Sequence, residues 1–220
     1  MMRQFLILLV SLLSMTVMGQ DFLTTRVVNY KQGGKDLSWD ASVEFPTDGD
    51  TRVVASVVGW IGEVLEVEGD FHRDWDRMLR TACDSFLTSG MRCQRSVSVE
   101  RSYEDNDCVT FEAMVTDKGD ETWRWADCAS FSKRDGHRIQ LDEIFDCDES
   151  DIQRLMWAYR GDLPLDADGP EDLIPVNAGF VDGWVVVIGP ARHYTGAPFR
   201  LRYEEIVDFL YTNEGGYFSK

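Results

Sequence analysis

The stretch GWVVVIGPARHYTGAPFRLRYEEIVDFL, residues 183–210, predicts two strands and a short helix at the C-terminal end of the chain. An apolar run at 184–188 breaks at Gly189-Pro190, and a cluster of three polar residues follows before an alternating strand resumes. That strand leads into a short helix with the sequence EEIVDFL. Because Asp182-Gly183 favours a tight turn, the apolar run is also predicted to pair with the segment before it.

The chain upstream of this stretch changes from a helical period to a strand period of two near residue 93. Apolar residues recur at helical spacing in 51–66 and again in 71–87, which ends at a Ser89-Gly90 cap. Two helices before a run of strands, with a short closing helix after them, predict an α+β fold with a mainly antiparallel sheet. The predicted strands of this region are 23–30, 41–46, 96–104, 108–116 and 122–131.

Two local patterns fix details of this arrangement. If Asp117-Lys118-Gly119 form the loop between strands 108–116 and 122–131, Glu112 lies opposite Arg124 and Cys108 lies opposite Cys128. Farther on, Ser150-x-x-Gln153 predicts a capping box at the start of another helix, and the Pro- and Gly-punctuated residues 161–172 predict a loop.

The chain contains 5 cysteines, which would pair in an oxidising compartment. The predicted disulfides are Cys83 with Cys93 and Cys108 with Cys128, and Cys147 is left over. The alternative is that the thiols stay free and act as small buried hydrophobes. No C-x-x-C spacing suggests a zinc site.

Residues 1–19, MMRQFLILLVSLLSMTVMG, have the layout of a secretory signal peptide. A positive charge at Arg3 precedes an apolar core at 5–13, and Gly19 provides a small residue at the cleavage point. The core is short for a bilayer span, although a retained membrane anchor is the alternative. The mature protein is therefore expected to be periplasmic or secreted, with no membrane insertion after signal cleavage.

The formal net charge of the chain is −17. Nucleic acid and anionic lipid carry charge of the same sign, and binding to phosphate requires a basic stripe that this sequence lacks. Nucleic acid is therefore excluded as a partner.

Two segments, DGHRIQLDEIFD at 135–146 and DGWVVVIGP…HYTG…FRLRYEEIVDFL at 182–210, resemble an exported domain of unknown function. That domain forms the C-terminal, extracytoplasmic part of RsiV-type anti-sigma factors and also occurs in some exported polysaccharide deacetylases. The resemblance implies an extracytoplasmic binding or sensory domain, with lysozyme as the partner in one branch. The loop GPARHYTG is shorter than the family's Tyr-Glu-Ile-Ala-Pro-Tyr loop, so the surface it makes differs.

This resemblance predicts a division of the chain into three parts. Residues 1–19 are the signal peptide, 20–104 form an N-terminal strand-helix-helix-strand region, and 105–220 form the RsiV-type C-terminal domain. One continuous globular unit over 20–220 is the alternative.

The cluster Arg192, His193 and Tyr194 is the first candidate ligand-binding group. Charge-assisted hydrogen bonds from these residues would orient an anionic or sugar ligand. A loop between strands also carries exposed polar residues without any such role, so the alternative is an ordinary surface loop.

Trp123 and Trp125 are the second candidate group. Because they stand two apart on a predicted strand, their side chains point to the same face. With Trp184 they would form a flat platform for sugar rings, whereas the alternative for the pair is sheet core under a helix.

The acidic loop residues do not follow an EF-hand spacing, because Pro164 stands where the first ligand would precede Asp166. A solvated loop is the expected role, and no metal or cofactor is predicted. The residues in question are Asp162, Asp166, Asp168, Glu171 and Asp172.

No catalytic residue is assigned, because the sequence shows no nucleophile motif and no Cys-His signature. The sequence therefore predicts an exported, soluble envelope protein of the non-catalytic binding type. Its ligand is expected to be a cell-wall glycan or a protein such as a cell-wall hydrolase. The alternative function is a cell-wall or glycan hydrolase whose acidic residues are assembled only by the fold.

Overall fold

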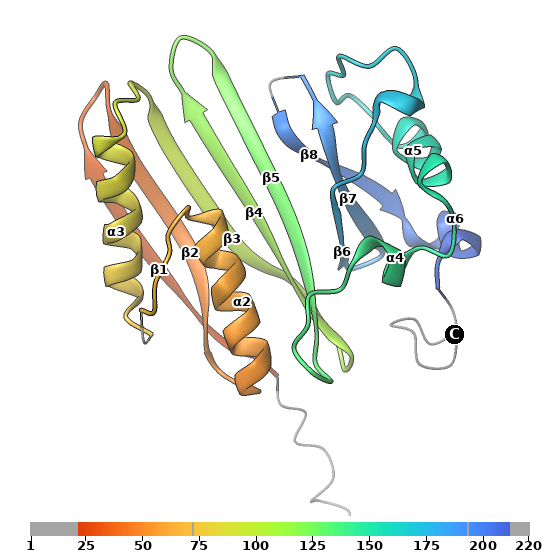
Figure 1. The fold of residues 1–220 in the computed structure, drawn as a ribbon, viewed down its shortest axis with the longest axis horizontal. Coiled ribbons are helices and arrows are strands. Elements are labelled where there is room, and N and C mark those ends of the chain that lie inside the picture. The colour runs from red at the N-terminus through yellow and green to blue at the C-terminus, as the bar shows by residue number, and fades with distance from the viewer. Residues whose placement is uncertain (1–21, 72, 193, 212–220) are drawn as a thin grey trace, which may run out of the picture.

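The computed structural model describes residues 22–71, 73–192 and 194–211 and joins its strands into one sheet (Figure 1). The predicted signal peptide and His193 lie outside the described residues. The strands are β1 (Thr24–Gly33), β2 (Ser38–Asp48), β3 (Gln94–Glu104), β4 (Cys108–Lys118), β5 (Thr122–Ser132), β6 (Asn177–Val181), β7 (Trp184–Ala191) and β8 (Tyr194–Arg202).

The order of strands in the sheet is β1-β2-β3-β4-β5-β8-β7-β6. The β2–β3 and β5–β8 pairs are parallel and the other pairs are antiparallel, which confirms the α+β class and the mainly antiparallel sheet. The helices are α2 (Thr51–Val64), α3 (Trp75–Thr88), α4 (Leu141–Ile144), α5 (Glu149–Ala158) and α6 (Tyr203–Ile206), with 3-10 turns η1 (Pro170–Asp172) and η2 (Val207–Phe209).

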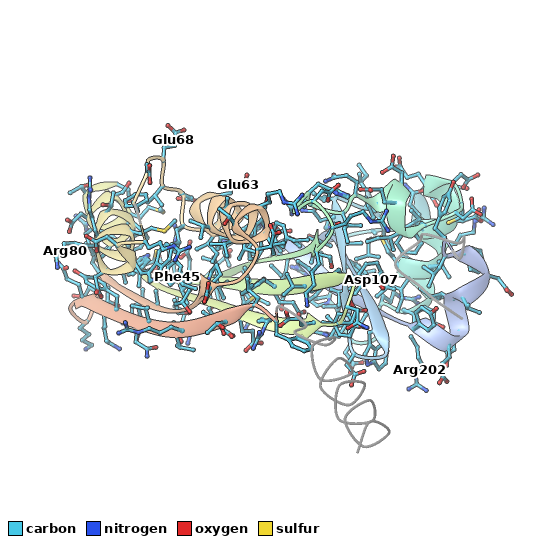
Figure 2. The ribbon with its side chains drawn as sticks, turned by 90° about the horizontal axis from the view of Figure 1, so that it is seen from below. Phe45, Glu63, Glu68, Arg80, Asp107 and Arg202 are labelled. Carbon is cyan, nitrogen blue, oxygen red and sulfur yellow. The ribbon has the colours of Figure 1, made fainter. Side chains whose placement is uncertain are left out.

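The two predicted helices of the N-terminal half, α2 and α3, lie over the same face of β1 to β5 (Figures 1 and 2). The Asp50 side chain caps α2 and the Asp74 side chain caps α3, each by accepting a backbone N–H. Helix α2 is rich in valine and contains two glycines, residues with low helix propensity. Its stability therefore depends on the face that it buries against the sheet.

The N-cap of helix α5 lies two residues before the predicted Ser150 cap, so the capping-box prediction is wrong. Its N-cap is Asp148, whose carboxylate accepts hydrogen bonds from the Asp151 backbone N–H at 3.0 Å and the Ser150 hydroxyl at 2.7 Å. A carboxylate at this position also interacts favourably with the helix dipole.

Strand β7 explains the apolar run at 184–188, because both of its faces are covered. Val185 and Val187 are buried in the core that includes α5, whereas Val186 and Ile188 pack against Ala126 and Cys128 of β5. Strand β6 also lies close to β5. A Cβ on Gly179 would stand 2.4 Å from the Cys128 sulfur, so only glycine fits this crossing.

The prediction for the β4–β5 hairpin is wrong, because the loop lies two residues later in the chain than expected. The loop consists of residues 119–121, because Lys118 pairs with Thr122. As a result Cys108 lies opposite Ser132, and Glu112 lies opposite Cys128 rather than Arg124. The alternation of faces is preserved because each partner shifts by an even number of residues.

All five cysteines are free thiols in the structure, so neither predicted disulfide is present. Cys108 and Cys128 are out of register by four residues on neighbouring strands, which removes the reason for linking them. Burial raises the pKa of the Cys83, Cys93 and Cys128 thiols above the usual value, and it raises that of Cys147 to about 11. Thiols with raised pKa values are weak nucleophiles.

The buried carboxylate of Asp127 on β5 joins the two halves of the molecule. It accepts hydrogen bonds from the Trp60 indole of α2 at 2.8 Å and from the Asn177 amide of β6 at 2.7 Å. The Arg138 guanidinium, on the segment after β5, lies 3.1 Å away and balances the charge. A buried carboxylate is tolerated only with such partners.

Replacement of this carboxylate, in the variant Asp127→Ala, is expected to lower the free energy of unfolding by roughly 3 kcal/mol, because it leaves the Trp60 indole and the Asn177 amide without their acceptor. Urea unfolding followed by circular dichroism measures the change. The matched control Asp120→Ala, in the exposed β4–β5 loop, should shift the midpoint little. Equal midpoints for the two variants would contradict a joining role for Asp127.

His137 lies between β5 and α4 and contacts two carboxylates. Its Nδ1 lies 2.6 Å from Asp135 and its Nε2 lies 2.9 Å from Glu143. Burial by itself lowers the pKa of His137, but the hydrogen bonds to these two carboxylates outweigh it, so the pKa is raised above the ordinary value. The same contact lowers the pKa of Asp135 to about 2.

A raised histidine pKa in the folded state adds stability below the unfolded pKa of about 6.5 and loses it as pH rises through the folded value. The destabilisation caused by His137→Gln is therefore expected to be larger at about pH 5 than at about pH 8. Urea midpoints of both proteins at the two pH values measure this difference. A difference that is unchanged or larger at the higher pH would show that the protonated ring is not the stabilising form.

Candidate functional site

Four side chains from four neighbouring strands form one row across the sheet. Trp39 of β2 pairs with Arg95 of β3, Arg95 pairs with Asp117 of β4, and Asp117 pairs with Trp123 of β5. Directly paired residues share a face, and adjacent strands are about 4.8 Å apart. The row therefore brings an aromatic ring, a guanidinium, a carboxylate and a second aromatic ring side by side.

Two carboxylates and one aromatic ring hold the Arg95 side chain in place. Its Nε and Nη2 donate to the two Asp117 oxygens, each at 2.8 Å, and its Nη1 donates to Glu66 at 3.4 Å. The guanidinium also lies 4.7 Å from the centre of the Phe86 ring. The hydrogen bonds to Asp117 raise the pKa of Arg95 above its usual value. A two-pronged pair of this kind has a fixed geometry, so it presents the same polar surface at all times.

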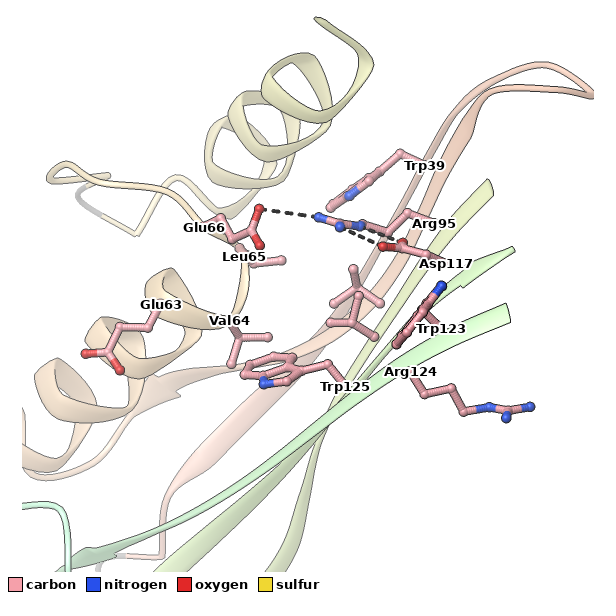
Figure 3. Close-up of a pocket in the computed structure, with 12 residues that line it drawn as sticks. Trp39, Glu63, Val64, Leu65, Glu66, Arg95, Asp117, Trp123, Arg124 and Trp125 are labelled. Carbon is pink, nitrogen blue, oxygen red and sulfur yellow. Dashed lines mark hydrogen bonds and ion pairs between the residues drawn. The ribbon is translucent and has the colours of Figure 1, made fainter. Parts of the chain in front are cut away.

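A groove of about 470 Å³ opens over this row, between the sheet and the end of α2 (Figure 3). Val97, Val115 and Trp125 from the neighbouring row line it, and residues 64–66 at the end of α2 form the facing wall. The volume falls within the range of roughly 300–1,000 Å³ that is usual for small-ligand sites. Trp123, at the outer end, is 49% exposed.

The charge inside the groove is negative. Asp117 neutralises Arg95, which leaves the Glu66 carboxylate in excess. Glu63, also on the wall, lies 3.6 Å from Arg138. The Arg124 side chain points away from the groove in Figure 3, and its guanidinium lies 5.7 Å from the centre of the Tyr194 ring.

The structure brings together the predicted pair Trp123 and Trp125, which both line the groove. Trp125 is half-buried and packs on the core, whereas Trp123 presents much of its surface to solvent. Trp184 does not join them. It pairs with Arg202 at the opposite end of β7 and β8 from Tyr194, and it lines a separate cleft of about 290 Å³ with Tyr203.

The described members of the predicted cluster, Arg192 and Tyr194, lie where β7 ends and β8 begins, and His193 is outside the described residues. Tyr194 begins β8 and pairs with Arg124 of β5, so it stands next to the strand that carries the tryptophans. Arg192 is exposed, and its Nε lies 3.7 Å from Asp166. Neither residue lines the groove.

Sequence reasoning did not find Trp39, Arg95 and Asp117. The parallel pairing of β2 with β3 brings Trp39 next to Arg95. The order of strands in a sheet cannot be predicted from hydrophobic periodicity or from turn residues. One signal was present. Arg95 alternates in phase with buried Val97, and Asp117 alternates in phase with buried Val115. Two opposite charges in the inward phase of neighbouring strands indicate an ion pair on the covered face.

Two further properties bear on the expected chemistry. Among the residues that the structure describes, no group of three or more His, Cys, Asp or Glu side chains is placed to hold a metal ion. Across the same described ranges, no helix is long and apolar enough to cross a membrane.

These features define an α+β protein with a tryptophan-lined groove on the helix-covered face of its sheet. No family model and no curated protein matches the sequence. The fold is similar to two solved structures of the DUF3298 family. The member from Bacteroides fragilis NCTC 9343 has a TM-score of 0.62 and 12% sequence identity, over 90% of this chain and 98% of that chain.

The second structure is a DUF3298 family protein from Pseudomonas aeruginosa PAO1. It has a TM-score of 0.55 and 9% identity, and the match covers 88% of this chain and 97% of that chain. At these identities the likeness concerns the fold, and it covers nearly the whole of both relatives. The finer RsiV-type assignment stays a prediction.

Proposed function

We propose that this protein is an exported, non-catalytic binding domain of the RsiV type, and that it binds a cell-envelope glycan in the groove between α2 and strands β3 to β5. The observation that carries the proposal is the exposed Trp123 face directly beside the fixed Arg95–Asp117 pair. An aromatic face suits the apolar side of a sugar ring, and a fixed polar pair suits its hydroxyl groups.

The polar pair has unused hydrogen-bonding capacity for such a ligand. Each Asp117 oxygen accepts one hydrogen bond from Arg95, and a carboxylate oxygen has room for another. A sugar ring stacked on Trp123 would place its hydroxyl groups one strand spacing, about 4.8 Å, from this carboxylate. Because the pair is already formed, little ordering is required on binding.

The same contacts favour binding over hydrolysis. A glycosidase requires one protonated carboxyl group to donate to the leaving oxygen and a second carboxylate on the other side of the bond. In the groove, Asp117 and Glu66 both accept hydrogen bonds from the Arg95 guanidinium. Both carboxylates are therefore engaged in ion pairs with one guanidinium, an arrangement that suits binding rather than the acid and base pair of a glycosidase.

The variant Trp123→Ala is expected to weaken glycan binding by about tenfold, which corresponds to about 1.4 kcal/mol of lost stacking. Its fold should be retained because the side chain is half exposed. Co-sedimentation with purified insoluble peptidoglycan, at low and at high salt, measures the retained fraction. Retention at high salt would exclude simple charge attraction.

The matched control is Trp184→Ala, which removes the same side chain from the separate cleft and should leave retention unchanged. Equal loss in both variants would contradict the assignment of the groove. Absence of retention in the unaltered protein would favour a protein partner instead. Release of soluble reducing sugar during the incubation would support the hydrolase alternative.

A further inference from the structure

We infer that the groove selects an amino sugar with a free, protonated amine over acetylated or acidic sugars. This inference rests on the proposed function and specifies the chemical class of its ligand. It is carried by the charge of the groove lining, where Arg95 is paired with two carboxylates and Arg124 is directed over the Tyr194 ring.

Among the described residues that line the groove, no cation is available for an acidic sugar. Arg95 is the only guanidinium that points into the described groove in Figure 3, and two carboxylates and the Phe86 ring surround it. Arg124 is directed away, over the Tyr194 ring. A carboxylate or phosphate substituent would therefore lie close to Asp117 and Glu66 with no unpaired arginine of the groove lining to bind it. Negative charges in close contact repel each other.

An ammonium group would meet the opposite situation. The Glu66 side chain is 74% exposed and receives only one hydrogen bond, from Arg95 at 3.4 Å. Its carboxylate is the unneutralised charge of the groove. The indole face of Trp123 attracts cations as well as apolar ring surfaces. In a glycan that spans the groove, one sugar unit would stack on the Trp123 indole while the amine of a neighbouring unit interacts with Glu66, whereas an acetamido group would lose the charge.

Glu66 also has a fixed backbone position. It is one of only two non-glycine residues with positive φ in the described ranges, at 56°, and its N–H donates to the Glu63 carbonyl at 3.0 Å. This conformation follows the end of α2 and directs the side chain to Arg95. In contrast, Glu68, two residues later on the same connection, stands clear of the molecule in Figure 2.

Isothermal titration calorimetry with three β-1,4-linked tetrasaccharides tests this inference. The ligands are oligomers of glucosamine, of N-acetylglucosamine and of glucuronic acid, titrated at about pH 5.5, where the free amine is protonated. The glucosamine oligomer is expected to bind about fivefold more tightly than the acetylated one, and the acidic oligomer should not bind. The preference should decrease as salt is raised.

The variants Glu66→Gln and Glu68→Gln form the matched pair. Both remove one negative charge from the same connection, so general attraction of a cation to an acidic protein changes equally. Only Glu66→Gln is expected to abolish the preference for the amine, and Trp123→Ala should weaken both the glucosamine and the acetylated oligomer. Tetralysine, which has charge without a sugar face, should not displace the bound oligomer.

The outcomes separate this inference from the proposed function. Equal affinity for the glucosamine and acetylated oligomers, still dependent on Trp123, would overturn the amine preference and leave the glycan groove intact. Tighter binding of the acidic oligomer, or loss of the preference in Glu68→Gln, would also overturn it. Absence of binding by all three oligomers would overturn both proposals together.

Discussion

The structure depends on one buried carboxylate. Asp127 lies in β5, where the helix-covered N-terminal core meets the strands β6 to β8, and it accepts hydrogen bonds from α2, from β6 and from Arg138. Within the described residues, the direct pairing of β5 with β8 consists of two residue pairs. The hydrogen bond from Asn177 to Asp127 joins the halves together with those from Phe180 N–H to Ser130 and from Arg200 to Glu112, and apolar packing around Cys128 completes the junction. A desolvated charge is costly without partners, so the arrangement of all three neighbours is fixed together.

The same principle shapes the groove. Arg95 and Asp117 occupy the inward phase of their strands, where Val97 and Val115 are buried, yet the pair is only partly covered because α2 ends at Val64. Partial cover leaves the pair polar and accessible while Phe86 and Glu66 restrain it. The end of a helix thus determines where the core stops and the candidate site begins. The proposed glycan function follows from this boundary, because it places a rigid polar pair next to an exposed indole.

Period and turn chemistry predicted the elements well. The helices at 51–64 and 75–88, the Asp182-Gly183 turn and the short closing helix were all readable, because each depends on neighbours within a few residues. The hairpin register failed because Asp117 and Lys118 continue the ladder, held by Arg95 and Thr122 across the sheet. The cysteine pairing failed with that register. At the site, the shared face of Trp123 and Trp125 was predicted from their spacing. The expectation that Trp184 joins them was wrong, because Trp184 lines a separate cleft.

The α+β class, the succession of helices and strands, and the shared face of the two tryptophans are all readable from the amino-acid sequence. These properties follow from alternation, capping and turn residues, which act locally along the chain. Only the tertiary structure decided which strands lie side by side. The parallel β2–β3 pairing places Trp39 beside Arg95, and the α2 terminus leaves Trp123 uncovered. Strand order results from the burial of whole faces at once, and that balance is not encoded in any short segment.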